Sequence, residues 1–174
     1  AHPIPDRIKH DLFNALKKQL PEGTFVAVRS SALGEDSKEF SYAGMLDTCL
    51  FRRSEAEICE AVVTCWSSIY SDRAVAYRNM RSIAQDTVSM AVVVQEMIDG
   101  VASGVTFTVN PTTRYEDEML ITSVFGLGEG LVSGTLDSDQ FICLKKDVYP
   151  VVEKQLANKV EKLVFDREKN YGTM

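Results

Sequence analysis

The stretch TFVAVRSSALGEDSKEFSYAG, residues 24 to 44, decides how we interpret this chain. Its first part, TFVAVR at 24 to 29, is rich in β-branched and aromatic residues and predicts a strand. The small and polar residues that follow have no clear period and predict a loop over 30 to 44. The expected strand therefore delivers Arg29 directly into a loop of serines and glycines.

Arg29 carries a planar fork of N–H donors that matches the oxygens of a phosphate. Gly34 and Gly44 would let the backbone approach a ligand closely. The plainer alternative is an ion pair between Arg29 and Glu35 or Asp36 in an ordinary surface loop. The residues by themselves favour that alternative, because short loops of serine and glycine are common.

A second candidate lies in VSMAVVVQEMI, residues 88 to 98, a nearly continuous apolar run that predicts a strand buried on both faces. Gln95 and Glu96 interrupt the run before Met97 and Ile98 resume it. A strand that leaves its sheet can present backbone C=O and N–H groups to a purine, with Met97 packed on the ring. The alternative is a strand end that simply reaches solvent.

A third candidate is SVFGLGEGLVSG, residues 123 to 134. Gly126, Gly128 and Gly130 follow an expected strand, but Leu131 stands where a dinucleotide-binding G-x-G-x-x-G loop needs glycine. No Lys-Ser or Lys-Thr follows, so the segment is not a Walker loop either. A turn that needs positive φ, with Glu129 facing a site, remains open.

The remaining patterns predict a mixture of helices and strands. Apolar spacing predicts helices over residues 6–20, from Ser54 onward behind an S-x-x-E capping box, over 72–81, and over 152–169. Further strands are expected at 45–51, 104–109, 119–125 and 140–144. We expect one domain of the α/β or α+β class.

Bulk properties exclude several classes of function. A net charge of −6 over 174 residues opposes nucleic-acid binding. No run of eighteen apolar residues predicts a membrane span. Four cysteines without a CxxC pair are expected as buried thiols in a reducing cytosol, so we predict a cytoplasmic protein. Neither histidine has a catalytic or metal-binding context, and we predict no metal ligands in this chain.

Five ordered blocks together resemble the N-terminal nucleotide-binding domain of the phosphoenolpyruvate synthase and pyruvate phosphate dikinase family. They are VAVRSSALGEDSKEFSYAGMLDT, CWSSIYSDRAVAYR, VVVQEMI, ASGVTFTVNP and FGLGEGLVSGTLDSDQF. The resemblance covers roughly residues 24 to 145, and five blocks in order are far more specific than any one of them.

The resemblance implies an ATP-grasp type nucleotide-binding domain, with mixed sheets flanked by helices and two subdomains that hold Mg-ATP. The family's catalytic, phosphate-contacting arginine corresponds to Arg29. The other implied nucleotide contacts are Gly44 and Thr48 near the phosphates, Gln95, Glu96, Met97 and Ile98 beside the adenine, and Glu129 of the GLGE motif.

Other parts of the family pattern have no counterpart here. The phosphate-binding lysine, the Mg²⁺ ligands, and the phosphohistidine and substrate domains are expected outside this chain. We therefore expect residues 1–174 to be a single incomplete ATP-binding domain, inactive alone, with a leading helix at 1–23, a motif-bearing core at 24–150 and a C-terminal helix at 151–174. A rifampicin phosphotransferase-like or glucan dikinase-like enzyme, or a non-catalytic nucleotide-binding module, remains the alternative.

Overall fold

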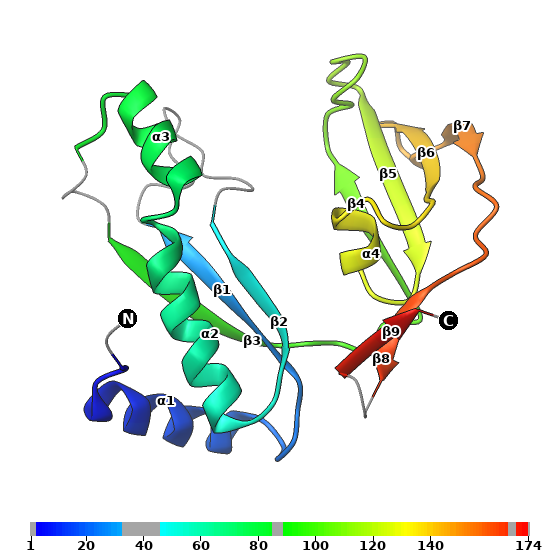
Figure 1. Ribbon diagram of the computed structural model, residues 1–174. Coiled ribbons are helices and arrows are strands. Elements are labelled where there is room, and N and C mark those ends of the chain that lie inside the picture. The colour runs from blue at the N-terminus through cyan, green and yellow to red at the C-terminus, as the bar shows by residue number, and fades with distance from the viewer. Residues whose placement is uncertain (1–2, 33–45, 85–88, 167–169, 174) are drawn as a thin grey trace. The chain divides into compact units, whose positions relative to one another are not determined.

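The chain forms two compact units, residues 1–97 and 98–174. Figure 1 shows the computed structural model, which describes residues 3–32, 46–84, 89–166 and 170–173. The first unit combines three helices with a sheet, and the second is mostly strands. This mixture confirms the expected α/β or α+β class.

The first unit has a three-stranded antiparallel sheet in the order β2-β1-β3. Its strands are β1 (Val26–Ala32), β2 (Thr48–Arg52) and β3 (Met90–Glu96). The central strand β1 continues three residues beyond the expected end at Arg29, because Ser30, Ser31 and Ala32 all pair with β3. The start of the predicted loop is therefore strand, and residues 33–45 lie outside the described residues.

Helix α2 (Glu55–Ser68) lies along one face of this sheet (Figure 1), and α1 (Asp6–Gln19) contributes to the same core. The third helix of the unit is α3 (Asp72–Met80). The core contains residues from α1, α2 and β1, including Phe13, Val26, Val28, Ile58 and Cys65. The predicted capping box is confirmed: Ser54 Oγ accepts from the Glu57 N–H, and the Glu57 carboxylate accepts from the Ser54 N–H. It satisfies two of the backbone donors that a helix start leaves unpaired.

None of the helices described in the first unit lies on the opposite face of the sheet. Along β3, Val92 and Val94 are half-buried and pack against the helical core, whereas Val93 between them is 47% exposed. The prediction that β3 is buried on both faces is therefore wrong for the unit as described. Its valines form a strand with one covered and one open face.

The second unit is built on a four-stranded antiparallel sheet in the order β4-β5-β6-β7. Its strands are β4 (Ala102–Phe107), β5 (Glu118–Phe125), β6 (Asp139–Leu144) and β7 (Val151–Gln155). The short helix α4 (Glu129–Val132) follows β5. A separate hairpin contains β8 (Leu163–Asp166) and β9 (Asn170–Thr173).

The predicted C-terminal helix is wrong, because β7, β8 and β9 occupy that part of the chain. Val152, Leu156 and Val160 recur every four residues, which is a helical spacing, yet each is more than half exposed. Pairing of β7 with its neighbour β6 overrides this local pattern. The expectation of mixed sheets is also wrong, since every ladder described is antiparallel and only an isolated bridge between Gly126 and Leu163 is parallel.

The other expected elements are confirmed to within a few residues. The helices at 6–20, after Ser54 and at 72–81 are present as α1, α2 and α3, and the strands near 45–51, 104–109, 119–125 and 140–144 are β2, β4, β5 and β6. Among the described residues, no helix is long and apolar enough to cross a bilayer.

Candidate functional site

The helix-free face of the first sheet brings together three of the predicted site residues, Arg29, Thr48 and Gln95. Arg29 lies opposite Thr48 on β2 and opposite Val93 on β3, and directly paired residues in a sheet point to the same face. Gln95 is two positions from Val93 and shares that face. All three side chains are exposed, so this face offers a guanidinium, a hydroxyl and an amide to a ligand.

A hydrogen bond joins two of these side chains: Arg29 Nη1 donates to Gln95 Oε1 over 3.4 Å. The bond is long and its acceptor is neutral, so it holds the guanidinium only weakly. A guanidinium has five N–H donors, and this contact uses one of them. Arg29 is therefore oriented along the open face while keeping donors for an anion.

The carbonyl oxygen of Asp47 fixes the chain immediately before Thr48. It accepts from the backbone N–H of Ser30 at 3.3 Å, from the Ser30 hydroxyl at 2.9 Å and from the Cys65 thiol at 3.5 Å. The Asp47 carboxylate also pairs with Arg73 on α3 at 3.1 Å. Sequence reasoning missed this junction, because no periodicity links Asp47 to Ser30, Cys65 and Arg73.

The Cys65 thiol is part of the same junction. It is fully buried and also donates to the carbonyl oxygen of Val28 at 3.4 Å. Burial, with a smaller effect from the nearby Cys49, raises the pKa of Cys65 to about 12. The thiol therefore stays protonated and acts as a structural donor, as the sequence predicted for a buried cysteine.

The residues expected beside an adenine do not all share the open face. Glu96 lies opposite Val26, so its side chain belongs to the helix-covered face, although it is exposed at the strand end. The Met97 N–H donates to Phe25 O at 2.9 Å, and Met97 Sδ accepts from the Phe51 N–H at 3.2 Å. Met97 is thus held by the first unit's own backbone, and only Gln95 accompanies Arg29.

The two remaining described residues belong to the second unit. Ile98 is 73% exposed at its start. Glu129 is exposed and is the first residue of α4, and Gly128 separates it from the buried Gly126 and Leu127. Gly126 has a φ of 77°, which confirms the expected turn with positive φ. Gly44 lies outside the described residues.

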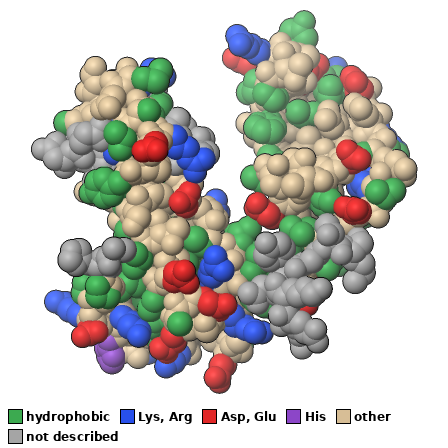
Figure 2. Space-filling view, in the orientation of Figure 1, with side chains coloured by type: hydrophobic (Ala, Val, Ile, Leu, Met, Phe, Trp, Pro, Cys, Tyr) green, Lys and Arg blue, Asp and Glu red, His purple; other side chains and the backbone are tan. Residues whose placement is uncertain are grey.

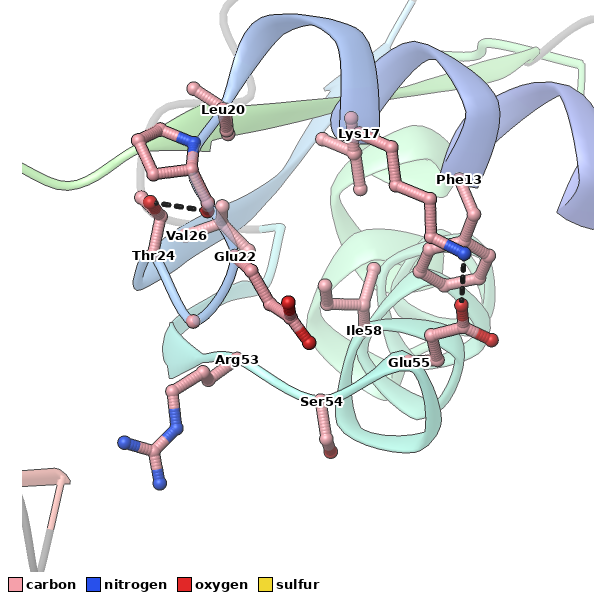
Figure 3. A pocket seen from close by; sticks show the side chains of 13 residues that line it. Phe13, Lys17, Leu20, Glu22, Thr24, Val26, Arg53, Ser54, Glu55 and Ile58 are labelled. Carbon is pink, nitrogen blue, oxygen red and sulfur yellow. Dashed lines mark hydrogen bonds and ion pairs between the residues drawn. The ribbon is translucent and has the colours of Figure 1, made fainter.

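A cavity of about 570 Å³ lies elsewhere in the first unit, between α1, the turn after it and the start of α2 (Figure 3). Its floor includes Phe13 and Ile58, and Lys17 and Glu55 form an ion pair beside it at 3.4 Å. None of the described site residues predicted above lines it. Its lining is largely apolar, and the Lys17–Glu55 pair neutralises two of its charges. We therefore interpret it as a seam between α1 and α2, and the helix-free sheet face is the better candidate site.

Charge and metal-ligand chemistry narrow what this face can bind. On the surface shown in Figure 2, acidic and basic side chains are intermixed, and the coloured residues form no continuous basic surface. In the described ranges, no three His, Cys, Asp or Glu side chains lie close enough together to hold a metal ion. A small anionic ligand that contacts one arginine and a hydroxyl fits this composition better than an extended polyanion.

Comparison with known proteins also indicates a nucleotide-binding domain. Residues 1–174 match the family described as pyruvate phosphate dikinase, AMP/ATP-binding domain. A phosphoenolpyruvate synthase of Aeropyrum pernix is 38% identical over 97% of this chain, and one of Helicobacter pylori is 35% identical over 94%. A prodigiosin synthesizing transferase of Serratia marcescens is 42% identical over 82%.

These relatives are much longer than the chain. The aligned part covers 21% of each of the two synthases and 16% of the Serratia transferase. The family match, by contrast, extends over all 174 residues and includes both compact units. The chain therefore belongs to the family of pyruvate phosphate dikinase AMP/ATP-binding domains.

Proposed function

We propose that this chain is the ATP-binding part of a phosphoenolpyruvate synthase-like dikinase, with an ATP-grasp type arrangement in which both compact units belong to one nucleotide-binding domain. Two observations support the proposal: the family match over the whole chain, and the naming of most similar relatives as phosphoenolpyruvate synthases. The phosphohistidine and substrate domains would lie in the rest of the complete protein, which would act in the cytoplasm.

The observation that carries this proposal is the shared open face of Arg29, Thr48 and Gln95. In the proposed complex, Arg29 contacts the phosphates of ATP through its fork of donors, and the Thr48 hydroxyl adds a further hydrogen bond. Gly44 would let the backbone approach the same phosphates. Binding would replace the long Arg29–Gln95 contact with shorter, charge-assisted ones.

The end of β3 is the proposed adenine side. Gln95, Glu96, Met97 and Ile98 would contribute backbone groups and apolar contact there, and Glu129 is a further proposed contact of the nucleotide. Because Met97 already bonds to Phe25 and Phe51 through its N–H and sulfur, its contribution would come from its side-chain surface.

Magnesium is the cofactor that the proposed reaction implies. Bound Mg²⁺ would neutralise phosphate charge during phosphoryl transfer. The described residues offer a phosphate-directed guanidinium and hydroxyl, but no trio of acidic side chains. We propose that the protein ligands of Mg²⁺ lie outside this chain, as the family resemblance implies, and assign to Arg29 and Thr48 only the binding and orientation of the phosphates.

A second candidate function shares the same ATP chemistry but has a different final acceptor. The Serratia relative is named for prodigiosin synthesis, so a similar domain occurs in a protein named for a different product. We propose that acceptor choice is made outside this chain. The residues assigned above contact only ATP, so they serve either function equally.

The test uses the complete protein with ATP, Mg²⁺ and pyruvate. We expect AMP formation that depends on pyruvate, and its loss in Arg29→Ala with the fold retained. Arg7→Ala is a matched control, since Arg7 is an exposed arginine on α1. ATP binding without pyruvate-dependent AMP would favour a different acceptor or a non-catalytic module, and lack of ATP binding would contradict the proposal.

A further inference from the structure

The segment of residues 156–163 contacts the glycine-rich turn that precedes Glu129. Residues 156–162 connect β7 to β8 without regular secondary structure, yet their position is fixed by β6. The Ala157 N–H donates to Asp139 Oδ1 at 3.0 Å, and Lys159 Nζ pairs with the same oxygen. These contacts lower the pKa of the Asp139 carboxyl, mainly through the hydrogen bond from Lys159.

The Asp139–Lys159 pair is more sheltered than the other ion pairs among the described residues. Its side chains are 15% and 10% exposed, whereas those of Arg73 and Asp47 are 60% and 42% exposed. Screening by water is weaker for such a pair, so its geometry is held more firmly. Lys159 Nζ also lies 5.3 Å from the centre of the Phe125 ring, within range of a cation–π contact. One ammonium group thus joins β6 to the last residue of β5.

Beyond Lys159, the same segment reaches the turn itself. Leu163 O accepts from the Leu127 N–H at 2.8 Å, and Leu163 bridges Gly126. A Cβ on Gly126 would lie 2.1 Å from Leu163 O, so the two backbones meet only because residue 126 is glycine. From the other side, Ser103 Oγ donates to Gly126 O at 2.7 Å.

The turn fixed in this way leads directly into α4, which begins with Glu129. We propose that Lys159 and Asp139 are positioning residues: their ion pair seats residues 156–163 against Gly126 and Leu127, and thereby fixes the position of Glu129 at the start of α4. This inference rests on the proposed function, in which Glu129 is one of the nucleotide contacts. Neither residue of the pair is proposed to touch the nucleotide.

The test is a double-mutant cycle on ATP affinity, measured by calorimetry in the complete protein. Lys159→Met should weaken ATP binding about tenfold, within the range for residues coupled through contacts. Lys159→Arg should restore most of the affinity, because it keeps the charge. Lys146→Met, at an exposed lysine after β6, should bind ATP like the wild type. In a Glu129→Gln background, Lys159→Met should weaken binding less than twofold further.

Three other outcomes would each overturn either this inference or the proposed function. A full tenfold loss in the Glu129→Gln background would overturn the inference, since the effect would not act through Glu129. Wild-type affinity of Lys159→Met beside a weakened Glu129→Gln would also overturn it, while leaving the proposed function intact. A wild-type protein that does not bind ATP would overturn the proposed function itself. Asp139→Asn, which removes only a charge, repeats the cycle if Lys159→Met does not fold.

Discussion

Arg29 and Gln95 are joined by a hydrogen bond across neighbouring strands, from Nη1 to Oε1 over 3.4 Å, on the face of the sheet where none of the described helices of its unit lies. Both side chains are exposed, so the bond contributes little to stability. Its importance is orientation, because it directs a cation along the face that also carries Thr48. The alternative partners Glu35 and Asp36 lie outside the described residues.

Substitution of Arg29 should therefore affect ligand binding far more than folding. We expect Arg29→Ala to weaken ATP binding about 10- to 100-fold, the effect of losing a hydrogen bond to a charged group. The free energy of unfolding should change by less than about 0.5 kcal/mol, as at most exposed positions. Calorimetry with ATP and urea unfolding of the complete protein measure the two effects.

Gln95→Ala tests the orientation of the Arg29 guanidinium without removing its charge. It removes the acceptor of the Arg29 bond but leaves the guanidinium, so we expect a loss of ATP affinity of only about two- to fivefold, as for a neutral hydrogen bond. If Arg29→Ala and Gln95→Ala weakened binding equally, the guanidinium would have no special role with the phosphates. Unchanged binding in Arg29→Ala would reduce Arg29 to a surface residue.

The capping box of α2 gives a prediction for stability and its dependence on pH. Hydrogen bonds from Ser54, chiefly its backbone N–H, lower the pKa of Glu57 from its ordinary value of 4.5. A lowered pKa means that the ionised carboxylate stabilises the fold above pH 4.5, and that this stabilisation disappears as pH falls through the folded-state pKa. Ser54→Ala should cost about 1 kcal/mol at pH 7.

Glu57→Gln tests the charge in that box. Its melting temperature should be lower than the wild type's at pH 7, and the difference should shrink as pH falls below 4.5. Glu60→Gln is a suitable control, because Glu60 is an exposed glutamate on the same helix. A difference between Glu57→Gln and wild type that stays constant from pH 7 to pH 3.5 would contradict the account.

The sequence predicted the elements of the first unit well because local signals and tertiary packing agree there. The capping box at Ser54, the apolar stripe of α2 and the strand that contains Arg29 all occur, although that strand continues to Ala32. The C-terminal segment shows the opposite case. Val152 and Leu156 have helical spacing. Without β7, however, one edge of β6 would lack a partner, and residues 151–155 form a ladder with that edge instead of a helix.

Part of the candidate site was also predictable, because strand alternation is a local signal. Strand alternation determines that Arg29 and Gln95 share a face, once the register of β1 with β3 is known. The register itself depends on residues more than sixty positions apart, which no local pattern encodes. Contacts such as Asp47 with Cys65, or Lys159 with Asp139, arise only when the chain is folded.

Chemical labelling tests the buried junction behind Arg29. Cys65 is fully buried, and its pKa of about 12 leaves almost no thiolate at pH 8. Iodoacetamide at pH 8 should therefore leave Cys65 unmodified in the native protein and alkylate it after unfolding in urea. Peptide mass spectrometry distinguishes it from the partly exposed Cys49 and Cys59. Rapid native labelling of Cys65 would show that the junction opens.

The last prediction separates two reasons for glycine in the second unit. Gly126 and Gly134 both have positive φ, 77° and 69°, but only Gly126 faces another backbone. Gly134→Ala meets no atom within 4 Å, so it should cost only the conformational term of about 1–2 kcal/mol. Gly126→Ala would place its Cβ against Leu163 O and should cost clearly more, because one of the two backbones must move.

Urea unfolding of both variants gives the comparison directly. Gly126→Ala should also weaken ATP binding, since the turn it distorts precedes Glu129, whereas Gly134→Ala should bind like the wild type. Equal destabilisation of the two variants would show that the backbone around Leu163 can move away from residue 126 at little cost in free energy. In that event the segment from 156 to 163 could not hold the turn in place, and the positioning role of Lys159 and Asp139 would fail with it.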